Sequence, residues 1–135
     1  AGDNYGWPVA DESCQYGSDK PIGVSHSDRD DVTTPVYSWP CGSGGFPPSG
    51  MTFYTAEAAS APRGIAAWQG DLFVGGLASQ SLARFRIDTR QVELIDHLLT
   101  NRGWRIRAVA VAPDSGAMYV AVDSNDAELI RIISD

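Results

Sequence analysis

The sequence predicts an all-β fold made of β-propeller blades, with about two four-stranded antiparallel blades in this chain. Short apolar runs follow one another at even spacing along most of the chain, with turn residues between them. Helical periodicity is weak throughout. A common plan of strands recurs after about 50 residues, which is typical of propeller blades.

The recurring plan is clearest in two aligned pairs of segments. Residues 71–75 align with residues 117–121, and residues 82–85 align with residues 129–132, where each segment carries an arginine among aliphatic residues. The whole chain is therefore expected to be a partial propeller domain. It would consist of an N-terminal region (1–48), one blade (49–99) and a second blade (100–135).

The N-terminal region is expected to be mostly irregular. Residues 11–34 hold acids, serines and glycines with little periodicity, which predicts a long loop. Residues 36–39 form a predicted short strand between Pro35 and Pro40, a position that suits a sheet edge because proline cannot donate a hydrogen bond.

The first blade is predicted to have four strands, at residues 49–54, 72–76, 81–88 and 91–99. An alanine-rich stretch at 56–61 predicts one helical turn that Pro62 and Gly64 end, and Thr89-Arg90 predicts a hairpin turn. The second blade is predicted to have three strands, at residues 105–112, 117–123 and 128–133. It is one strand short, and the strand at 36–39 is the candidate to complete it, within the chain or in a neighbouring copy.

Composition excludes several classes of partner. The chain has 135 residues and a formal net charge of -7, with Lys20 as its single lysine. This charge argues against nucleic-acid binding, which needs a basic face. No apolar run approaches membrane-spanning length, and the polar start predicts no signal peptide. Cys14 and Cys41 lie in turn-rich sequence, which fits a disulfide in an oxidising compartment and equally two free thiols.

Arg105 and Arg107 are the candidate binding residues. They are two residues apart, so on extended backbone both side chains point to one side and Ile106 points to the other. Two adjacent guanidinium groups repel each other unless an anion lies between them, and their fork geometry suits a carboxylate or phosphate. The alternative is a pair of solvated arginines at a strand start, paired with nearby Asp or Glu.

The sequence predicts no metal site and no catalytic residue. Asp28, Asp30 and Asp31 lack the spacing of a calcium loop, and no Cys/His spacing supports a zinc site. His26 lies in the acidic loop and His97 on an outer strand, so neither is placed to act as a general base.

Five short motifs follow one another in an order that resembles a known family. They are Asn4-Tyr5-Gly6-Trp7-Pro8, Pro35-Val36-Tyr37-Ser38-Trp39, Pro48-Ser49-Gly50-Met51-Thr52-Phe53-Tyr54, Trp68-Gln69-Gly70-Asp71-Leu72-Phe73-Val74-Gly75 and Arg105-Ile106-Arg107. Together they resemble the C-terminal portion of soluble aldose sugar dehydrogenases, the glucose/sorbosone dehydrogenase family. Its members are six-bladed β-propellers that oxidise sugars with pyrroloquinoline quinone (PQQ) and bind calcium. The resemblance covers nearly all of this chain but less than half of a family member.

The resemblance implies roles for three residues. Arg105 and Arg107 would lie at the central channel and bind carboxylates of PQQ, and Trp39 would line the sugar and cofactor pocket, with a core tryptophan as the alternative. Some members carry a cofactor-binding lysine at the position of Ala78. The family's catalytic histidine, its Arg-Asn cofactor contacts and most of its calcium ligands belong to N-terminal blades outside this resemblance.

Two hypotheses for function follow from the resemblance. The first is part of a bacterial quinoprotein sugar dehydrogenase, periplasmic or secreted, which binds a sugar or small anionic ligand but lacks the catalytic half. The second is a non-catalytic binding or assembly module, or an inactive fragment. Because two open blades expose sheet edges, we expect a homo-oligomer, with a trimer favoured over a dimer, or a longer parent chain.

Overall fold

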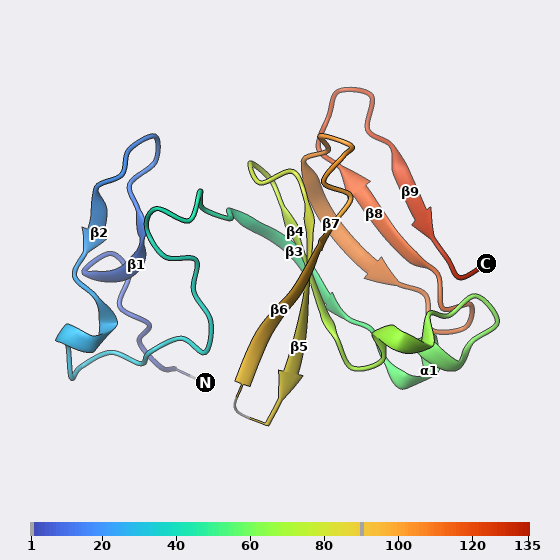
Figure 1. Ribbon diagram of the computed structural model, residues 1–135, viewed down its shortest axis with the longest axis horizontal. Coiled ribbons are helices and arrows are strands. Elements are labelled where there is room, and N and C mark those ends of the chain that lie inside the picture. Colours follow the sequence, from blue (N-terminus) through green and yellow to red (C-terminus); the bar gives the residue numbers. More distant parts are fainter. Residues whose placement is uncertain (1, 90) are drawn as a thin grey trace. The chain divides into compact units, whose positions relative to one another are not determined.

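The computed structural model describes residues 2–89 and 91–135, and the chain divides into two compact units, Ala1–Gly45 and Phe46–Asp135. The described residues form nine β-strands, one short α-helix and two 3-10 turns (Figure 1). Every strand pairing between them is antiparallel. The predicted all-β fold is therefore confirmed. No helix in these two stretches is long or apolar enough to cross a membrane.

The smaller unit contains a hairpin of strand β1 (Ala10–Cys14) and strand β2 (Pro21–Gly23), followed by the 3-10 turn η1 (His26–Asp28). The predicted long loop over residues 11–34 is therefore wrong where this hairpin forms, while most of residues 2–35 lie outside strands, as predicted. Strand β1 has the sequence ADESC, so it lacks the apolar alternation by which strands are recognised. Polar contacts hold it instead: Asp11 Oδ1 accepts hydrogen bonds from the backbone N–H and the hydroxyl of Ser13, at 2.6 and 2.5 Å.

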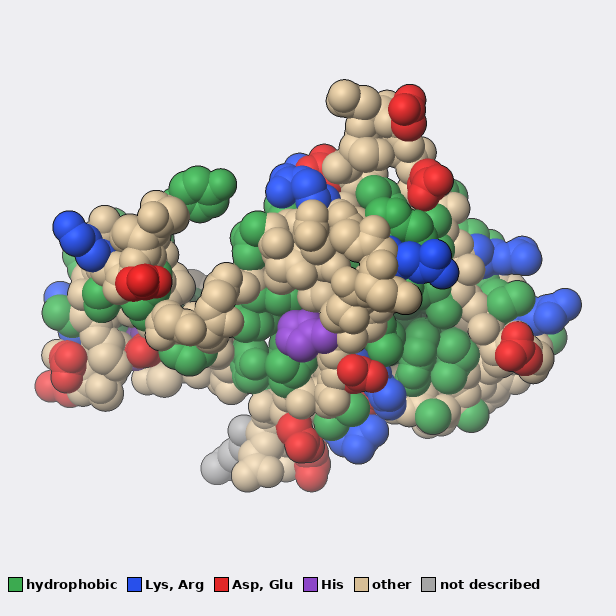
Figure 2. Space-filling model, turned by 45° about the horizontal axis from the view of Figure 1, so that its top comes forward, with side chains coloured by type: hydrophobic (Ala, Val, Ile, Leu, Met, Phe, Trp, Pro, Cys, Tyr) green, Lys and Arg blue, Asp and Glu red, His purple; other side chains and the backbone are tan. Residues whose placement is uncertain are grey.

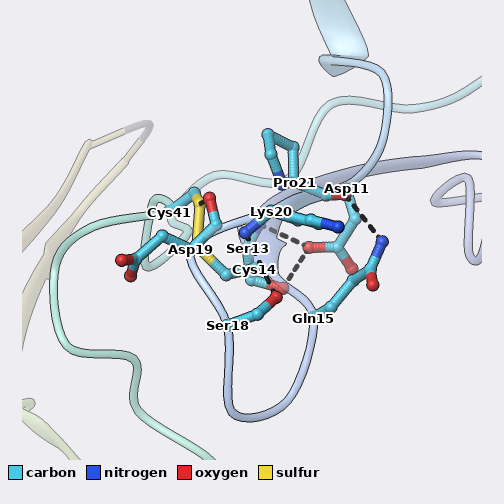
Figure 3. Close-up of a disulfide and its surroundings, with 9 residues drawn as sticks. All are labelled: Asp11, Ser13, Cys14, Gln15, Ser18, Asp19, Lys20, Pro21 and Cys41. Carbon is cyan, nitrogen blue, oxygen red and sulfur yellow. Dashed lines mark hydrogen bonds between the residues drawn. A yellow bond between two sulfur atoms is a disulfide. The ribbon is translucent and has the colours of Figure 1, made fainter.

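A disulfide joins Cys14 at the end of β1 to Cys41 (Figure 3). The two residues are 27 positions apart, and their Cα atoms are 4.7 Å apart. Closing a loop of this length stabilises a fold by about 3–4 kcal/mol in the chain-entropy model. The Cys41 N–H also donates to the carbonyl of Glu12 at 2.6 Å. Of the two states that the sequence left open for these cysteines, the structure has the disulfide.

Residues 36–39 form no strand, so that prediction is wrong. Pro35 and Pro40 remove backbone donors on both sides of the segment. The ring of Tyr37 packs edge-on against that of Trp39, with centroids 5.1 Å apart. The segment therefore does not supply the strand that the second blade lacks.

The larger unit opens with a four-stranded sheet. Its strands lie side by side in chain order: β3 (Pro48–Phe53), β4 (Leu72–Gly76), β5 (Leu82–Asp88) and β6 (Gln91–Leu98). Helix α1 (Ala56–Ser60) and the 3-10 turn η2 (Ala66–Trp68) connect β3 to β4. All four strands begin and end within one residue of the predicted bounds. Arg90, in the predicted Thr89-Arg90 turn, lies outside the described residues.

A three-stranded sheet follows. It contains β7 (Ile106–Val111), β8 (Met118–Val122) and β9 (Leu129–Ile132), again in chain order and within one residue of the predicted bounds. In Figure 1 the two sheets stand next to each other as separate twisted layers. Strands β3 and β7, the first strand of each sheet, approach each other closely, as the contacts of Ser49 and Gly50 below show.

The two sheets share the same register, which confirms the alignment of the repeat. The partners in β4 and β5 are Leu72–Phe85, Phe73–Arg84, Val74–Ala83 and Gly75–Leu82. The corresponding partners in β8 and β9 are Met118–Ile132, Tyr119–Arg131, Val120–Ile130 and Ala121–Leu129. An irregularity also falls at the matching place early in β3 and in β7. Each residue of one sheet therefore has an identifiable counterpart in the other.

Tyr54 is at the centre of the core that joins the two sheets. It is fully buried and packs against Trp68 and Phe73, with ring centroids 5.6 and 6.1 Å away. Its hydroxyl donates to the carbonyl of Gly116 at 2.5 Å and accepts from the N–H of Ile65 at 2.9 Å. Gly116 lies in the turn between β7 and β8, so this one side chain links the first sheet to the second.

Apolar side chains remain exposed on the larger unit. Met51 and Phe53 of β3 are 58% and 53% exposed, and Leu129 of β9 is 69% exposed. Figure 2 shows hydrophobic side chains at the surface of the molecule among charged ones. Because alternate residues of a strand share a face, Met51 and Phe53 mark an uncovered apolar face of β3.

We predict that Tyr54→Phe lowers the free energy of unfolding by about 1–3 kcal/mol, because it leaves the Gly116 carbonyl and the Ile65 N–H without their partner in the core. Urea denaturation measures the change. Tyr119→Phe is the control, since the half-buried Tyr119 hydroxyl makes no hydrogen bond within residues 2–89 and 91–135. Equal stability of both variants would contradict the role given to the Tyr54 hydroxyl.

Candidate functional site

The candidate site begins at Ile106, which lies between the two arginines. Ile106 is fully buried in the core. Its carbonyl accepts a hydrogen bond from the Ser49 hydroxyl at 2.6 Å, and the same hydroxyl lies 2.9 Å from the carbonyl of Gly75. These bonds fix the start of β7 against β3 and β4. Burial of Ile106 on one side directs Arg105 and Arg107 to the other.

Two glycines permit this close approach of the sheets. A Cβ atom at Gly75 would lie 2.6 Å from Cγ2 of Ile106, and a Cβ atom at Gly50 would lie 2.8 Å from Cα of Ala108. Distances this short do not occur between real side-chain atoms. A larger residue at either position would therefore displace the strand that carries the arginines.

Arg105 and Arg107 converge on one carboxylate. Arg105 donates from Nε and Nη2 to Oδ2 of Asp123 at 3.1 and 3.0 Å, and Arg107 donates from Nη2 to the same oxygen at 3.1 Å. Both guanidinium groups therefore point to the same side, as their spacing predicts. The structure also shows the pairing with a nearby acid that the alternative interpretation expected, because both arginines bond to Asp123.

The cluster is open to solvent and retains a positive charge. The side chains of Arg105 and Arg107 are 46% and 55% exposed, and that of Asp123 is 31% exposed. Hydrogen bonds from Arg105 first, and then from Arg107, hold the pKa of Asp123 below its ordinary value. Asp123 is therefore ionised at neutral pH and offsets one of two positive charges. Each guanidinium has N–H donors left over for a further acceptor.

An open pocket of about 370 Å³ lies beside the cluster. Its lining residues are Gly103, Trp104, Arg105, Val122, Asp123, Ser124, Asp126 and Glu128. Trp104 is half-buried, and the guanidinium of Arg102 lies over its ring at 5.4 Å from the centroid. The pocket thus combines an aromatic wall with charges of both signs.

A second arginine pair shows what a purely structural arrangement of this kind looks like. Arg84 Nε donates to Asp71 Oδ2 at 2.5 Å, and Arg86 Nε lies 3.6 Å from Asp71 Oδ1. The side chain of Asp71 is 3% exposed, and that of Arg84 is 14% exposed. Arg84 also donates to the carbonyl of Ala67 at 2.7 Å, which ties β5 to turn η2. Burial separates this packing cluster from the open one at Asp123.

Asp123 was missed by the sequence reasoning, although a signal was present. Strand β8 folds back on β7 through a four-residue turn, and counting pairs outward from that turn places Asp123 opposite Ile106, next to both arginines. The register shift between Ile106 and Ala108, which the sequence does not reveal, moves Asp123 opposite Arg105. The backbone confirms this placement, since the Asp123 N–H donates to the Arg105 carbonyl at 2.7 Å.

The other candidate residues lie on other elements of the chain. Trp39 belongs to the smaller unit, where it is half-buried with its ring against Tyr37. Ala78 is exposed just after β4. His97 is exposed on the edge strand β6, where its Nδ1 lies 3.1 Å from the Ser81 hydroxyl. The described part of the chain brings together no group of three or more His, Cys, Asp or Glu that could hold a metal ion.

His26 is buried in the smaller unit between two acceptors. Its Nδ1 lies 3.0 Å from Oε1 of Glu12, and its Nε2 lies 2.9 Å from the carbonyl oxygen of Tyr5. An imidazole donates from both nitrogens only when protonated. The Tyr5 carbonyl, and then Glu12, therefore raise the pKa of His26. The N–H groups of His26 in turn lower the pKa of Glu12.

The chain matches the family described as glucose / sorbosone dehydrogenase over residues 1–131. It is 35% identical over 133 residues to an uncharacterized protein of Synechocystis, covering 98% of this chain and 29% of that protein. It is 30% identical over 131 residues to the aldose sugar dehydrogenase YliI of Escherichia coli, covering 97% of this chain and 33% of that one.

Solved structures give the same result for the fold. A crystal structure of a glucose dehydrogenase matches with a TM-score of 0.78 and 32% identity, over 99% of this chain and 36% of that chain. The soluble aldose sugar dehydrogenase of Escherichia coli in its apo form matches with a TM-score of 0.74 and 31% identity, over 96% and 35%. This chain thus spans about a third of the length of the relatives it matches.

We predict that the smaller unit is most stable between about pH 4.5 and 6.5, the ordinary pKa values of Glu12 and His26. The contribution of His26 is complete below its ordinary pKa and is lost as pH rises through its raised value. That of Glu12 is complete above its ordinary pKa and is lost as pH falls through its lowered value. Limited proteolysis across this pH range measures the rate of local opening.

His26→Gln should remove the loss of stability on the alkaline side. His97→Gln is the control, because His97 lies on an exposed edge strand of the larger unit. If both variants kept the wild-type pH profile, the role of the His26 contacts would be disproved.

Proposed function

This chain belongs to the glucose/sorbosone dehydrogenase family, and on that premise we propose that it is the cofactor-binding part of a quinoprotein sugar dehydrogenase. In this proposal Arg105 and Arg107 bind a carboxylate of PQQ. The observation that carries it is the convergence of two half-exposed guanidinium groups on one point at the surface of the larger unit.

The chemistry of these residues fits a ligand that carries carboxylates. Guanidinium groups bind carboxylates through paired, charge-assisted hydrogen bonds. Both arginines keep donors that Asp123 does not use, and the pocket beside them has an aromatic wall at Trp104. A flat ring compound with a carboxylate matches Trp104 and the arginine donors; Asp126 and Glu128 also line the pocket, so the match rests on these contacts and not on the net charge of the pocket. When bound, PQQ would supply the two-electron oxidant for the sugar.

The residues of this chain would bind and orient rather than transfer protons. Arg105 and Arg107 would hold the carboxylate through fixed donors, and the buried Ile106 would keep their strand in place. Trp39 is proposed to line the sugar and cofactor pocket, as the family resemblance implies. His26 is engaged by Glu12 and Tyr5, and His97 lies on an edge strand, so we assign the catalytic base to neither.

Calcium fits less well, because the described residues form no group of acidic or histidine ligands that could hold it. No role for the ion is derived from this chain. The family resemblance implies that most calcium ligands of a whole family member belong to other blades.

The alternative function is a non-catalytic binding or assembly module, and one position favours it. The residue that corresponds to the cofactor-binding lysine of some family members is Ala78, which lies exposed after β4. Such a module would keep the open arginine pair for a small anionic ligand without oxidising a sugar.

We further propose that other blades cover the open faces of this chain. The support is the exposed Met51 and Phe53 on β3 and the free edge of the three-stranded sheet at β9. Two further copies would complete a ring of about six blades. A dimer that packs the open faces together, or a longer parent chain, would cover the same surfaces.

The compartment is proposed to be oxidising, either periplasmic or extracellular. The Cys14–Cys41 disulfide supports this, because such bonds persist where thiols are not kept reduced.

We predict that Arg107→Ala weakens binding of PQQ by about tenfold or more, since it removes one charge-assisted hydrogen bond to a carboxylate. Quenching of tryptophan fluorescence in a titration measures the affinity. The wild-type affinity should also fall as salt concentration rises.

Arg86→Ala is the matched control, because its side chain is 55% exposed, as is that of Arg107, and both substitutions remove one positive charge. It should leave the affinity within about twofold, because it lies outside the site. Equal losses of affinity in both variants would show that only the net charge of the protein matters. Absence of PQQ binding by wild type would refute the proposed function.

A further inference from the structure

We propose that Asp123 is a positioning residue that holds Arg105 and Arg107 together, so that one carboxylate can be bound by both. This inference rests on the proposed function for its ligand. Its structural part, the clamping of the two arginines, can be tested without any ligand.

The clamp is built from side chain and backbone together. Oδ2 of Asp123 accepts three hydrogen bonds from guanidinium N–H groups, two from Arg105 and one from Arg107, at 3.0–3.1 Å. The Asp123 N–H donates to the Arg105 carbonyl at 2.7 Å, so the carboxylate cannot shift along the strand independently of Arg105. Without this acceptor, two neighbouring guanidinium groups would repel each other and separate.

The internal repeat shows that the sheet does not need this cluster. By the shared register, Ser49 corresponds to Arg107 and Leu77 corresponds to Asp123. The first sheet forms the same strand pairing and the same irregularity with these uncharged residues. At these two positions the second sheet has arginine and aspartate together and the first sheet has neither, as expected of parts of one binding site.

The solvent exposure of Asp123 and its two arginines also supports a role in binding a ligand. Asp71 holds Arg84 in a buried cluster, where removal of a partner would leave a charge in the core. The side chain of Asp123 is 31% exposed and those of its two arginines about half exposed, so their pairing contributes little to folding. Fixing donors at an open surface benefits a ligand rather than the core.

Asp126 provides a control within the same pocket. It also lines the pocket beside Arg105. In the part of the chain that the structure describes, no hydrogen bond or ion pair joins it to either arginine. Asp123→Asn and Asp126→Asn each remove one negative charge from the pocket. By charge alone, both should strengthen anion binding slightly.

The first measurement follows the arginine Nε–H signals by NMR in the ligand-free chain, with Arg105→Lys to assign the signal of Arg105. We expect the Nε–H of Arg105 to exchange with water several-fold faster in Asp123→Asn and at the wild-type rate in Asp126→Asn, because only Asp123 accepts a bond from it. Equal exchange rates in wild type, Asp123→Asn and Asp126→Asn would show that Asp123 does not hold Arg105 and would overturn the proposal.

The second measurement is the PQQ affinity of wild type, Asp123→Asn and Asp126→Asn. We expect Asp123→Asn to weaken binding about tenfold despite the added positive charge, and Asp126→Asn to match or exceed wild type. Equal strengthening by both substitutions would show that Asp123 acts only as a negative charge and would overturn the proposal. If wild type bound no PQQ, the proposed function would fail, while the exchange rates would still decide whether Asp123 clamps the arginines.

Discussion

Burial of Ile106 is the constraint on which the candidate site depends. The side chain of Ile106 lies in the core, and its backbone carbonyl accepts a hydrogen bond from the Ser49 hydroxyl. Together these contacts fix the side of the strand to which the neighbouring side chains point. Gly50 and Gly75 let the first strands of the two sheets come close enough for this contact. The packing of Ile106 thus sets the side of β7 to which the arginines point, and their contacts with Asp123 bring the two guanidinium groups together.

The same pairing of two arginines with one aspartate serves two purposes in this chain. Around Asp71 it is buried and also bonded to backbone, so it joins β5 to the turn before β4. Around Asp123 it faces solvent beside a pocket. An exposed ion pair contributes little to folding, and this is why we propose a ligand for the open cluster.

Much of the larger unit was predictable because its strands are apolar and evenly spaced, and a repeated register left little freedom in their pairing. The smaller unit was not. Strand β1 is polar and held by the Cys14–Cys41 disulfide, which spacing alone does not reveal, and residues 36–39 look like a strand but lie between two prolines. The arginine spacing predicted that both side chains point to one side, whereas their pairing with Asp123 required the register of β7 with β8.

The most direct test of this account is a crystal structure of the chain with PQQ bound. The account predicts a carboxylate of the quinone within about 3 Å of guanidinium nitrogens of both Arg105 and Arg107, with Asp123 still bonded to the pair. A quinone bound elsewhere on the chain, with the two arginines in contact only with Asp123, would contradict it.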